Sequence, residues 1–123
     1  MRAISSPIPL DAPVTKAVVM RGHYRATVPV VLCVLLNAVP GSEADLVAYE
    51  DEVLPLLADH EARVVQRVRA VEAGEGPYEV HVLEFASQAA VDGYLEDPRR
   101  TALLAERDRV IAQTTIVPVE IVS

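Results

Sequence analysis

The sequence contains one cysteine, Cys33, and this scarcity excludes two kinds of site. A chain with a single cysteine can form neither an intrachain disulfide nor a zinc site built from several cysteines. Cys33 lies inside the apolar run of residues 30–36, so we interpret it as a small buried hydrophobic residue and not as a nucleophile. The sequence therefore gives no indication of thiol chemistry.

Positive charge is also scarce, because 11 Lys and Arg stand against 18 Asp and Glu, for a net charge of -7. Such a chain repels nucleic acid phosphates and anionic lipid headgroups. The apolar run of residues 28–36 is too short to span a bilayer, and the N-terminus lacks the charged-then-apolar pattern of a signal peptide. We predict a cytoplasmic protein with no nucleic acid partner and no membrane partner.

The motifs of several enzyme classes are missing. No two histidines have helical metal-binding spacing, and no Gly-x-Ser-x-Gly nucleophile elbow occurs. A metal ion would have to be assembled from His23, His60 and His81, which lie far apart in the sequence. Gly74 and Gly76 flank one Glu in a turn and form no phosphate loop. We predict no metal and no cofactor.

The length of 123 residues allows one domain with a modest core. Three prolines, Pro7, Pro9 and Pro13, punctuate the beginning of the chain. We interpret residues 1–27 as an N-terminal extension or arm that could dock on a neighbouring subunit, and residues 28–123 as the folded domain.

From residue 29 onward the hydrophobic pattern is regular. It predicts a buried strand over residues 30–36 and then an amphipathic helix that is capped by Ser42 and kinked at Pro55. Further strands are predicted over residues 62–69, 78–85 and 114–122, with a second helix between the last two that begins at Ser87 and is split at Asp97 and Pro98.

This order, β-α-β-β-α-β, is that of the ferredoxin-like α+β fold. In that fold both helices cover one face of a four-stranded antiparallel sheet. The other face would expose Val, Leu and Phe side chains to water. We therefore predict a homodimer that pairs two copies through the open sheet face.

A family resemblance rests on residues 78–111. The sequence reads Val-Leu-Glu-Phe-Ala-Ser over residues 82–87, then Tyr94, then Asp-Pro-Arg from Asp97, and Ala-Leu-Leu-Ala-Glu-Arg-Asp over residues 102–108. This set resembles the DUF1330-like branch of the dimeric α+β barrel superfamily, and the likeness extends over about residues 28–122. It implies a dimer whose two sheets form a barrel, with a small-molecule cavity between each sheet and its helices.

The residues that match this branch are few and are partly polar. They are Glu84, Phe85, Tyr94, Asp97, Pro98 and Arg107, while Arg63 matches a basic position and His60 departs from the pattern. The superfamily includes antibiotic-biosynthesis monooxygenases, muconolactone isomerases, polyketide cyclases and chlorite-dismutase-like haem proteins. The closer branch has no agreed activity, so the resemblance implies a fold and no reaction.

Two charged residues fall at positions that the pattern assigns to the core. Glu84 shares a strand face with Val80 and Val82, and Arg107 is surrounded by apolar residues at helical spacing. We predict that the two form a buried ion pair, which either fixes the helix on the sheet or lines a pocket.

His81 lies on the strand face opposite Glu84, so we expect it in the barrel interior or at the dimer seam, as a proton-transfer group or a core residue. Tyr49 and Tyr94 lie on the inward stripes of their helices. Together with Arg63 they are candidates for ligand binding, and ordinary core packing is the alternative for the tyrosines.

Two functions are consistent with these residues. The first is a small-molecule-binding protein, with the properties of a cofactor-independent enzyme of the cyclase, isomerase or monooxygenase type, that acts on a small apolar oxygenated metabolite such as a polyketide or aromatic compound. Glu84 or His81 would accept a proton, and Arg107 or a tyrosine would stabilise the anion. The second is a non-catalytic dimeric binding or scaffold module in which the Glu84–Arg107 pair is purely structural.

Overall fold

The computed structural model describes residues 28–122, so the predicted N-terminal arm lies outside the described residues. The chain forms four strands and a set of helical segments in an α+β arrangement. The elements are β1 (Val30–Ala38), α3 (Glu43–Val53), η2 (Leu54–His60), β2 (Ala62–Arg69), β3 (Glu79–Phe85), α4 (Gln88–Leu95), α5 (Pro98–Thr101), α6 (Leu104–Val110) and β4 (Ile111–Pro118).

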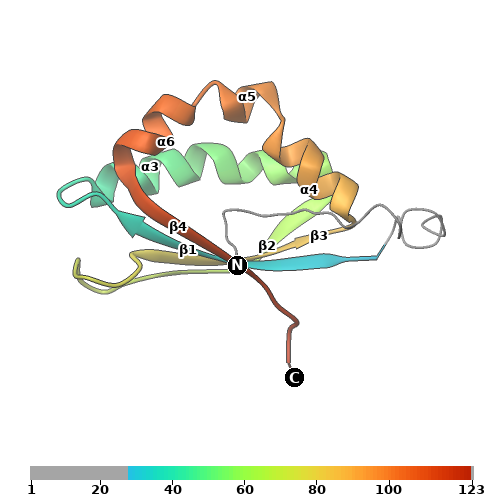
Figure 1. Cartoon of the computed structure of the whole chain (residues 1–123), viewed down its shortest axis with the longest axis horizontal. Helices are drawn as coiled ribbons and strands as arrows, with labels where there is room; N and C mark the ends of the chain where they lie inside the picture. The colour runs from blue at the N-terminus through green and yellow to red at the C-terminus, as the bar shows by residue number, and fades with distance from the viewer. Residues whose placement is uncertain (1–27, 123) are drawn as a thin grey trace.

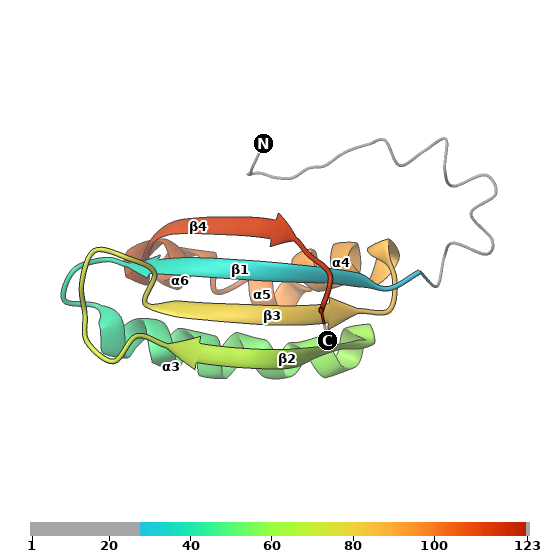
Figure 2. The ribbon, with the colours of Figure 1, turned by 90° about the horizontal axis from the view of Figure 1, so that it is seen from below.

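The molecule has two layers, with all helical segments on one face of the sheet (Figure 1). The strand order is β2-β3-β1-β4, and each neighbouring pair is antiparallel (Figure 2). This confirms the predicted ferredoxin-like fold. The edge strands are β2, which mixes apolar and basic residues, and β4, which ends at Pro118. Among residues 28–122, none of the helices is long and apolar enough to cross a membrane.

The first helix changes its geometry at the predicted kink. Its first turn carries Glu43 and Asp45, which complement the helix dipole. Proline cannot donate a backbone hydrogen bond, and at Pro55 the α-helix gives way to the 3-10 helix η2. Ser42 occupies the N-cap position, as predicted, but its side chain makes no capping hydrogen bond.

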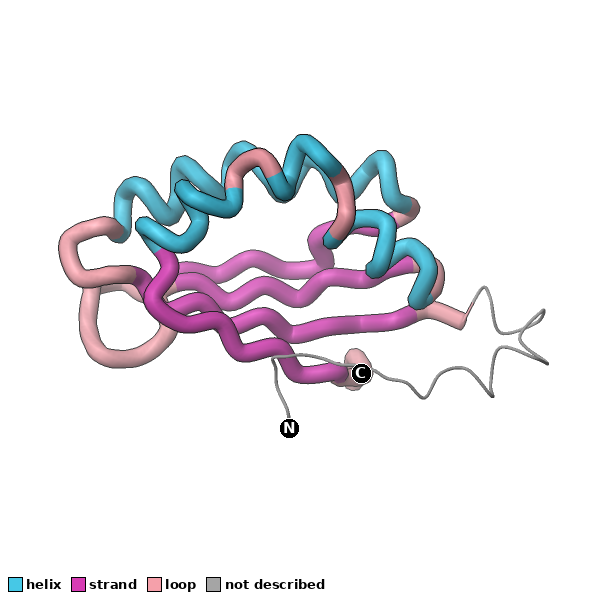
Figure 3. Tube along the Cα trace, turned by 45° about the horizontal axis from the view of Figure 1, so that its top comes forward, coloured by secondary structure: helices cyan, strands magenta, loops and turns pink. Residues whose placement is uncertain are grey.

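The second helix is divided into three pieces and not into the two that were predicted (Figure 3). Two side chains cap these pieces as expected. Ser87 Oγ accepts a hydrogen bond from Ala90 N at 3.2 Å, and Asp97 Oδ1 accepts one from Arg99 N at 2.8 Å. Pro98 then occupies the first turn of α5.

The space between the layers holds two apolar clusters. One includes Leu83, Phe85 and Tyr94, and the other includes Leu36 and Tyr49. Val34 of β1 packs against both clusters and is paired with His81 of β3. A polar residue of β3 therefore sits where the two apolar clusters meet.

Candidate functional site

The face that β3 turns toward the helices carries two buried polar residues. Glu79 and His81 are 0% and 1% exposed, and they share this face with the buried Leu83 and Phe85. Burying a charge requires partners, because an unpaired ion loses its hydration. The partners of Glu79 come from the neighbouring edge strand β2 and from His81.

Arg67 and Arg69 hold the Glu79 carboxylate from β2. Arg67 donates from Nε to Oε1 at 2.8 Å and from Nη2 to Oε2 at 3.0 Å, and Arg69 donates from Nε to Oε2 at 2.7 Å. Both arginines reach the helix side because the register of β2 shifts between Val64 and Gln66. Beyond that bulge, residues that strict alternation would place on the open face turn inward.

His81 lies between two carboxyl groups. Its Nε2 is 2.7 Å from Glu79 Oε1, and its Nδ1 is 4.0 Å from Glu50 Oε1. Because an ionised carboxylate can only accept a hydrogen bond, Nε2 carries the proton in the neutral ring. The lone pair of Nδ1 then faces Glu50 across a gap that is too long for a direct hydrogen bond.

Glu50 lies on α3 and is 5% exposed. Among residues 28–122, no hydrogen-bond donor reaches its carboxyl group. Burial raises the pKa of Glu50 to about 6, the charge of His81 acts to lower it, and the charge of Glu79 adds to the increase. At neutral pH this acid is therefore mostly ionised, but its pKa lies within about one unit of the ambient pH.

The pKa of Glu79, in contrast to that of Glu50, is lowered. Burial acts to raise its pKa, but hydrogen bonds from His81, Arg67 and Arg69 outweigh burial and hold the pKa at about 2. One imidazole thus separates a permanently ionised carboxylate from a carboxyl group that can change its protonation. Such separation of pKa values is typical of acid and base pairs in active sites.

The two inward tyrosines border this polar set, as the helical spacing predicted. Tyr49 on α3 and Tyr94 on α4 are both buried. Burial raises the pKa of Tyr94 to about 12 and also raises the pKa of Tyr49. Both phenols are therefore neutral hydrogen-bond donors at physiological pH.

The predicted Glu84–Arg107 pair is wrong. Glu84 faces the open side of the sheet, where Arg63 contacts it at 2.8 Å, while Arg107 donates to Thr114 Oγ1 at 2.6 Å. The sheet separates the two groups, since β3 turns Val80, Val82 and Glu84 away from the helices. His81 does lie opposite Glu84, but under the helices and not toward a barrel interior or dimer seam.

Sequence reasoning missed four members of the site, which are Glu50, Glu79, Arg67 and Arg69. Glu50 is one of several acidic residues of the amphipathic helix, and such residues are typical of a solvated helix face. A signal existed for Glu79, because it alternates with His81 and with the bulky Leu83 and Phe85, the residues best suited to a covered face. Nothing in the sequence marks the bulge that turns the arginines inward.

Two surface hollows lie near predicted site residues. One of about 570 Å³ at the end of the sheet is lined by Pro29, Ala58, Glu61, Ala62, Arg63, Glu84, Phe85 and Ala86. The other, of about 370 Å³ at the β4 edge, is lined by Arg107, Asp108, Ile111, Ala112, Gln113, Thr114 and Ile116. Within the described part of the chain, no group of three or more His, Cys, Asp or Glu is placed to hold a metal ion.

The fold and the buried polar set define an α+β protein of the ferredoxin-like class. Residues 35–122 match the family described as "Domain of unknown function (DUF1330)", and the chain belongs to that family. This confirms the resemblance that the sequence of residues 78–111 indicated. A search of the curated proteins found no match.

Solved structures with the same fold share little sequence with this chain. RPA0582, a protein of unknown function from Rhodopseudomonas palustris, is 17% identical with a TM-score of 0.65, over 90% of this chain and 96% of that one. A putative antibiotic biosynthesis monooxygenase from Caulobacter crescentus is 15% identical with a TM-score of 0.65, over 85% and 99% of the two chains. A dimeric protein of unknown function from Bacteroides fragilis is 19% identical with a TM-score of 0.60, over 76% and 96%.

Proposed function

We propose that this protein binds a small, mostly apolar, oxygenated molecule beside Glu50 and His81 and transfers a proton within it without a cofactor. One observation carries the proposal. The buried His81 is fixed at Nε2 by Glu79 at 2.7 Å, while its Nδ1 faces the Glu50 carboxyl group at 4.0 Å. The ring therefore has one nitrogen held in place and one available for chemistry.

The roles of the three groups follow from their protonation states. Glu79 stays ionised and orients the ring, so His81 acts as a base through Nδ1. Glu50, with a pKa of about 6 and 4.0 Å from Nδ1, can take up the proton or return it to the bound molecule. The base would remove a proton from a carbon next to a carbonyl group, and a neutral phenol of Tyr49 or Tyr94 would donate to the enolate oxygen.

Cyclisation, isomerisation and cofactor-free oxygenation all begin with such a step. The putative antibiotic biosynthesis monooxygenase of similar fold supports this class of chemistry only by analogy, because related folds host unrelated activities. Compared with the sequence-based hypothesis, the proposal keeps His81 and the tyrosines, and it replaces Glu84 with Glu50.

The proposed assembly is a homodimer through the open sheet face. That face carries partly exposed apolar side chains: Val31, Cys33, Leu35, Val80, Val82 and Val117. A continuous apolar surface of this kind is typical of an interface. The Bacteroides fragilis protein of similar fold is described as dimeric, which supports a dimer by analogy.

Proton exchange from a ketone tests the catalytic proposal. The protein is incubated with 2-tetralone in D₂O, and the loss of the α-proton signals is followed by proton NMR. Wild type should accelerate exchange, and H81A should reduce the acceleration about 100-fold or more, since general acid–base groups contribute roughly that much. E50Q should slow exchange as well.

E84Q is the matched control for E50Q. It removes the same charge, but Glu84 lies on the opposite face of the sheet, so its exchange rate should equal that of wild type. Equal rates in wild type and H81A would contradict the proposal. Binding of 2-tetralone without any acceleration would instead support the non-catalytic binding module, in which Arg67, Arg69 and Glu79 only tie β2 to β3.

A further inference from the structure

Two arginines differ from the other arginines of the described chain. Most lie within 3.0 Å of a carboxylate oxygen, namely Arg63, Arg67, Arg69, Arg99 and Arg109. Among residues 28–122, Arg100 has no carboxylate within salt-bridge distance, and Arg107 has only that of its neighbour Asp108, at 3.7 Å. Arg100 donates to the carbonyl oxygen of Leu95 at 3.3 Å and Arg107 to Thr114 Oγ1 at 2.6 Å, so within the described part of the chain both hydrogen-bond only to neutral groups. In a chain with a net charge of -7, guanidinium groups without a close carboxylate are unexpected.

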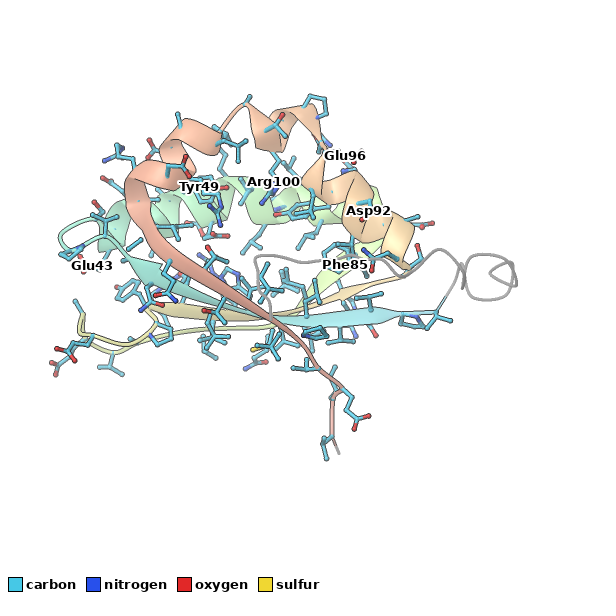
Figure 4. All side chains as sticks on the ribbon, viewed as in Figure 1. Glu43, Tyr49, Phe85, Asp92, Glu96 and Arg100 are labelled. Atoms are coloured by element: carbon cyan, nitrogen blue, oxygen red, sulfur yellow. The ribbon has the colours of Figure 1, made fainter. Side chains whose placement is uncertain are left out.

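Both side chains belong to the helical cover of the candidate site. Arg100 on α5 lies over the ring of the buried Tyr94, 5.3 Å from its centroid. In Figure 4, Arg100 and Tyr49 both lie in the layer between the helices and the sheet. The Arg107 side chain on α6 is 26% exposed and lines the hollow of about 370 Å³.

The two cations act on the same phenol. Leu103 and Val110, one turn before and one turn after Arg107, pack with Tyr49 in one apolar cluster. Burial raises the pKa of Tyr49, while the charges of Arg100 and Arg107 both act to lower it. The charge of Arg107 also acts on Glu50. The hollow that Arg107 lines lies at the β4 edge.

The cross-strand register places two residues of this hollow on the same face of the sheet as His81. Ile116 and Thr114 line the hollow, Ile116 is paired with Val34 of β1, and Val34 is paired with His81. Since neighbouring strands lie about 4.8 Å apart, the row from Ile116 to His81 spans about 10 Å. The hollow of about 370 Å³ beside Arg107 has room for a molecule of one or two rings.

We propose that Arg100 and Arg107 form a carboxylate-binding subsite beside Tyr49, so that the ligand of this protein is a small apolar carboxylic acid. This proposal rests on the proposed function, because it assumes that the apolar part of the ligand binds as proposed there. A planar guanidinium group matches a carboxylate with two parallel hydrogen bonds. A single negative charge suits the site better than a phosphate dianion, because Glu50 and Asp108 add negative charge nearby.

The test compares two probes that share a ring system and differ in charge, 2-naphthoate and 2-naphthalenemethanol. Their affinities for the full chain are measured by titration calorimetry. Wild type should bind the acid about tenfold more tightly or better, because hydrogen bonds to charged groups strengthen binding by roughly that factor. R107Q and R100Q should each remove most of this preference and leave the affinity for the alcohol within about twofold.

R109Q is the matched control, since Arg109 lies on the same helix as Arg107 but pairs with Glu106 at the surface. It should keep the full preference for the acid. R107K should keep part of this preference, because lysine retains the positive charge but cannot form the two parallel hydrogen bonds of a planar guanidinium group. Circular dichroism of each variant verifies that it is folded.

The outcomes separate this subsite from the proposed function. The carboxylate subsite is refuted if wild type binds both probes equally, or if R109Q loses the preference for the acid as R107Q does. Neither result would contradict the proposed binding of an apolar molecule or the proposed proton transfer. Binding of neither probe would refute both proposals. Displacement of 2-naphthoate by inorganic phosphate at similar concentration would show an anion site of another class and would overturn the assignment to carboxylic acids.

Discussion

Replacing Glu50 with Gln should stabilise the protein at neutral and alkaline pH. Glu50 is 5% exposed, and burial raises its pKa from the ordinary 4.5 to about 6. The folded protein therefore holds this proton more tightly than the unfolded chain does. The stability associated with the neutral acid is fully present below about pH 4.5 and is lost as the pH rises through about 6.

The size of the effect follows from the same two values. The difference between 4.5 and about 6, at about 1.4 kcal/mol for each tenfold change in proton affinity, corresponds to about 2 kcal/mol. Glutamine has nearly the shape of the neutral acid and cannot ionise. E50Q should therefore match wild type near pH 4.5 and exceed its free energy of unfolding by about 2 kcal/mol near pH 8.

Urea unfolding followed by circular dichroism at several pH values measures this difference. All proteins are compared at one concentration, because the stability of the proposed homodimer would depend on concentration. E52Q is the matched control, since Glu52 is exposed on the same helix and its replacement removes the same charge. Its stability difference from wild type should stay within about 0.5 kcal/mol across the range. A difference between E50Q and wild type that does not change with pH would refute the reasoning, as would an E50Q protein that is less stable than wild type near pH 8.

Three further predictions concern other parts of the structure. Glu79, with a pKa of about 2, should contribute about 3 kcal/mol of stability above about pH 4.5 that is lost as the pH falls through 2, so E79Q should abolish this acid-sensitive component in urea unfolding. An E79Q protein with an unchanged acid profile would show that the two arginines do not fix the charge. S87A should cost about 1 kcal/mol, because Ser87 Oγ caps α4 through Ala90 N, and a loss below about 0.3 kcal/mol would contradict the capping role. V82D should turn the proposed homodimer into a folded monomer in size-exclusion chromatography, because it places a charge on the open sheet face, while E84Q on the same face should stay dimeric.

The sequence determined the order of the elements, because local patterns carry that information. Apolar runs marked the strands, and Ser87, Asp97 and Pro98 marked the starts of helical pieces through capping and backbone geometry that involve only neighbouring residues. The β-α-β-β-α-β order then left few arrangements, and the ferredoxin-like sheet is one of them.

The tertiary structure decided which residues form the site. Alternation along β3 assigns residues to two faces, but both faces carry apolar side chains, so the pattern does not say which face the helices cover. The helices cover the face of His81 and Glu79, and Glu84 is left on the other. The inward turn of Arg67 and Arg69 depends on a bulge in β2, and the burial of Glu50 depends on how α3 packs on the sheet. These are long-range packing outcomes, so the site is visible only in the folded chain.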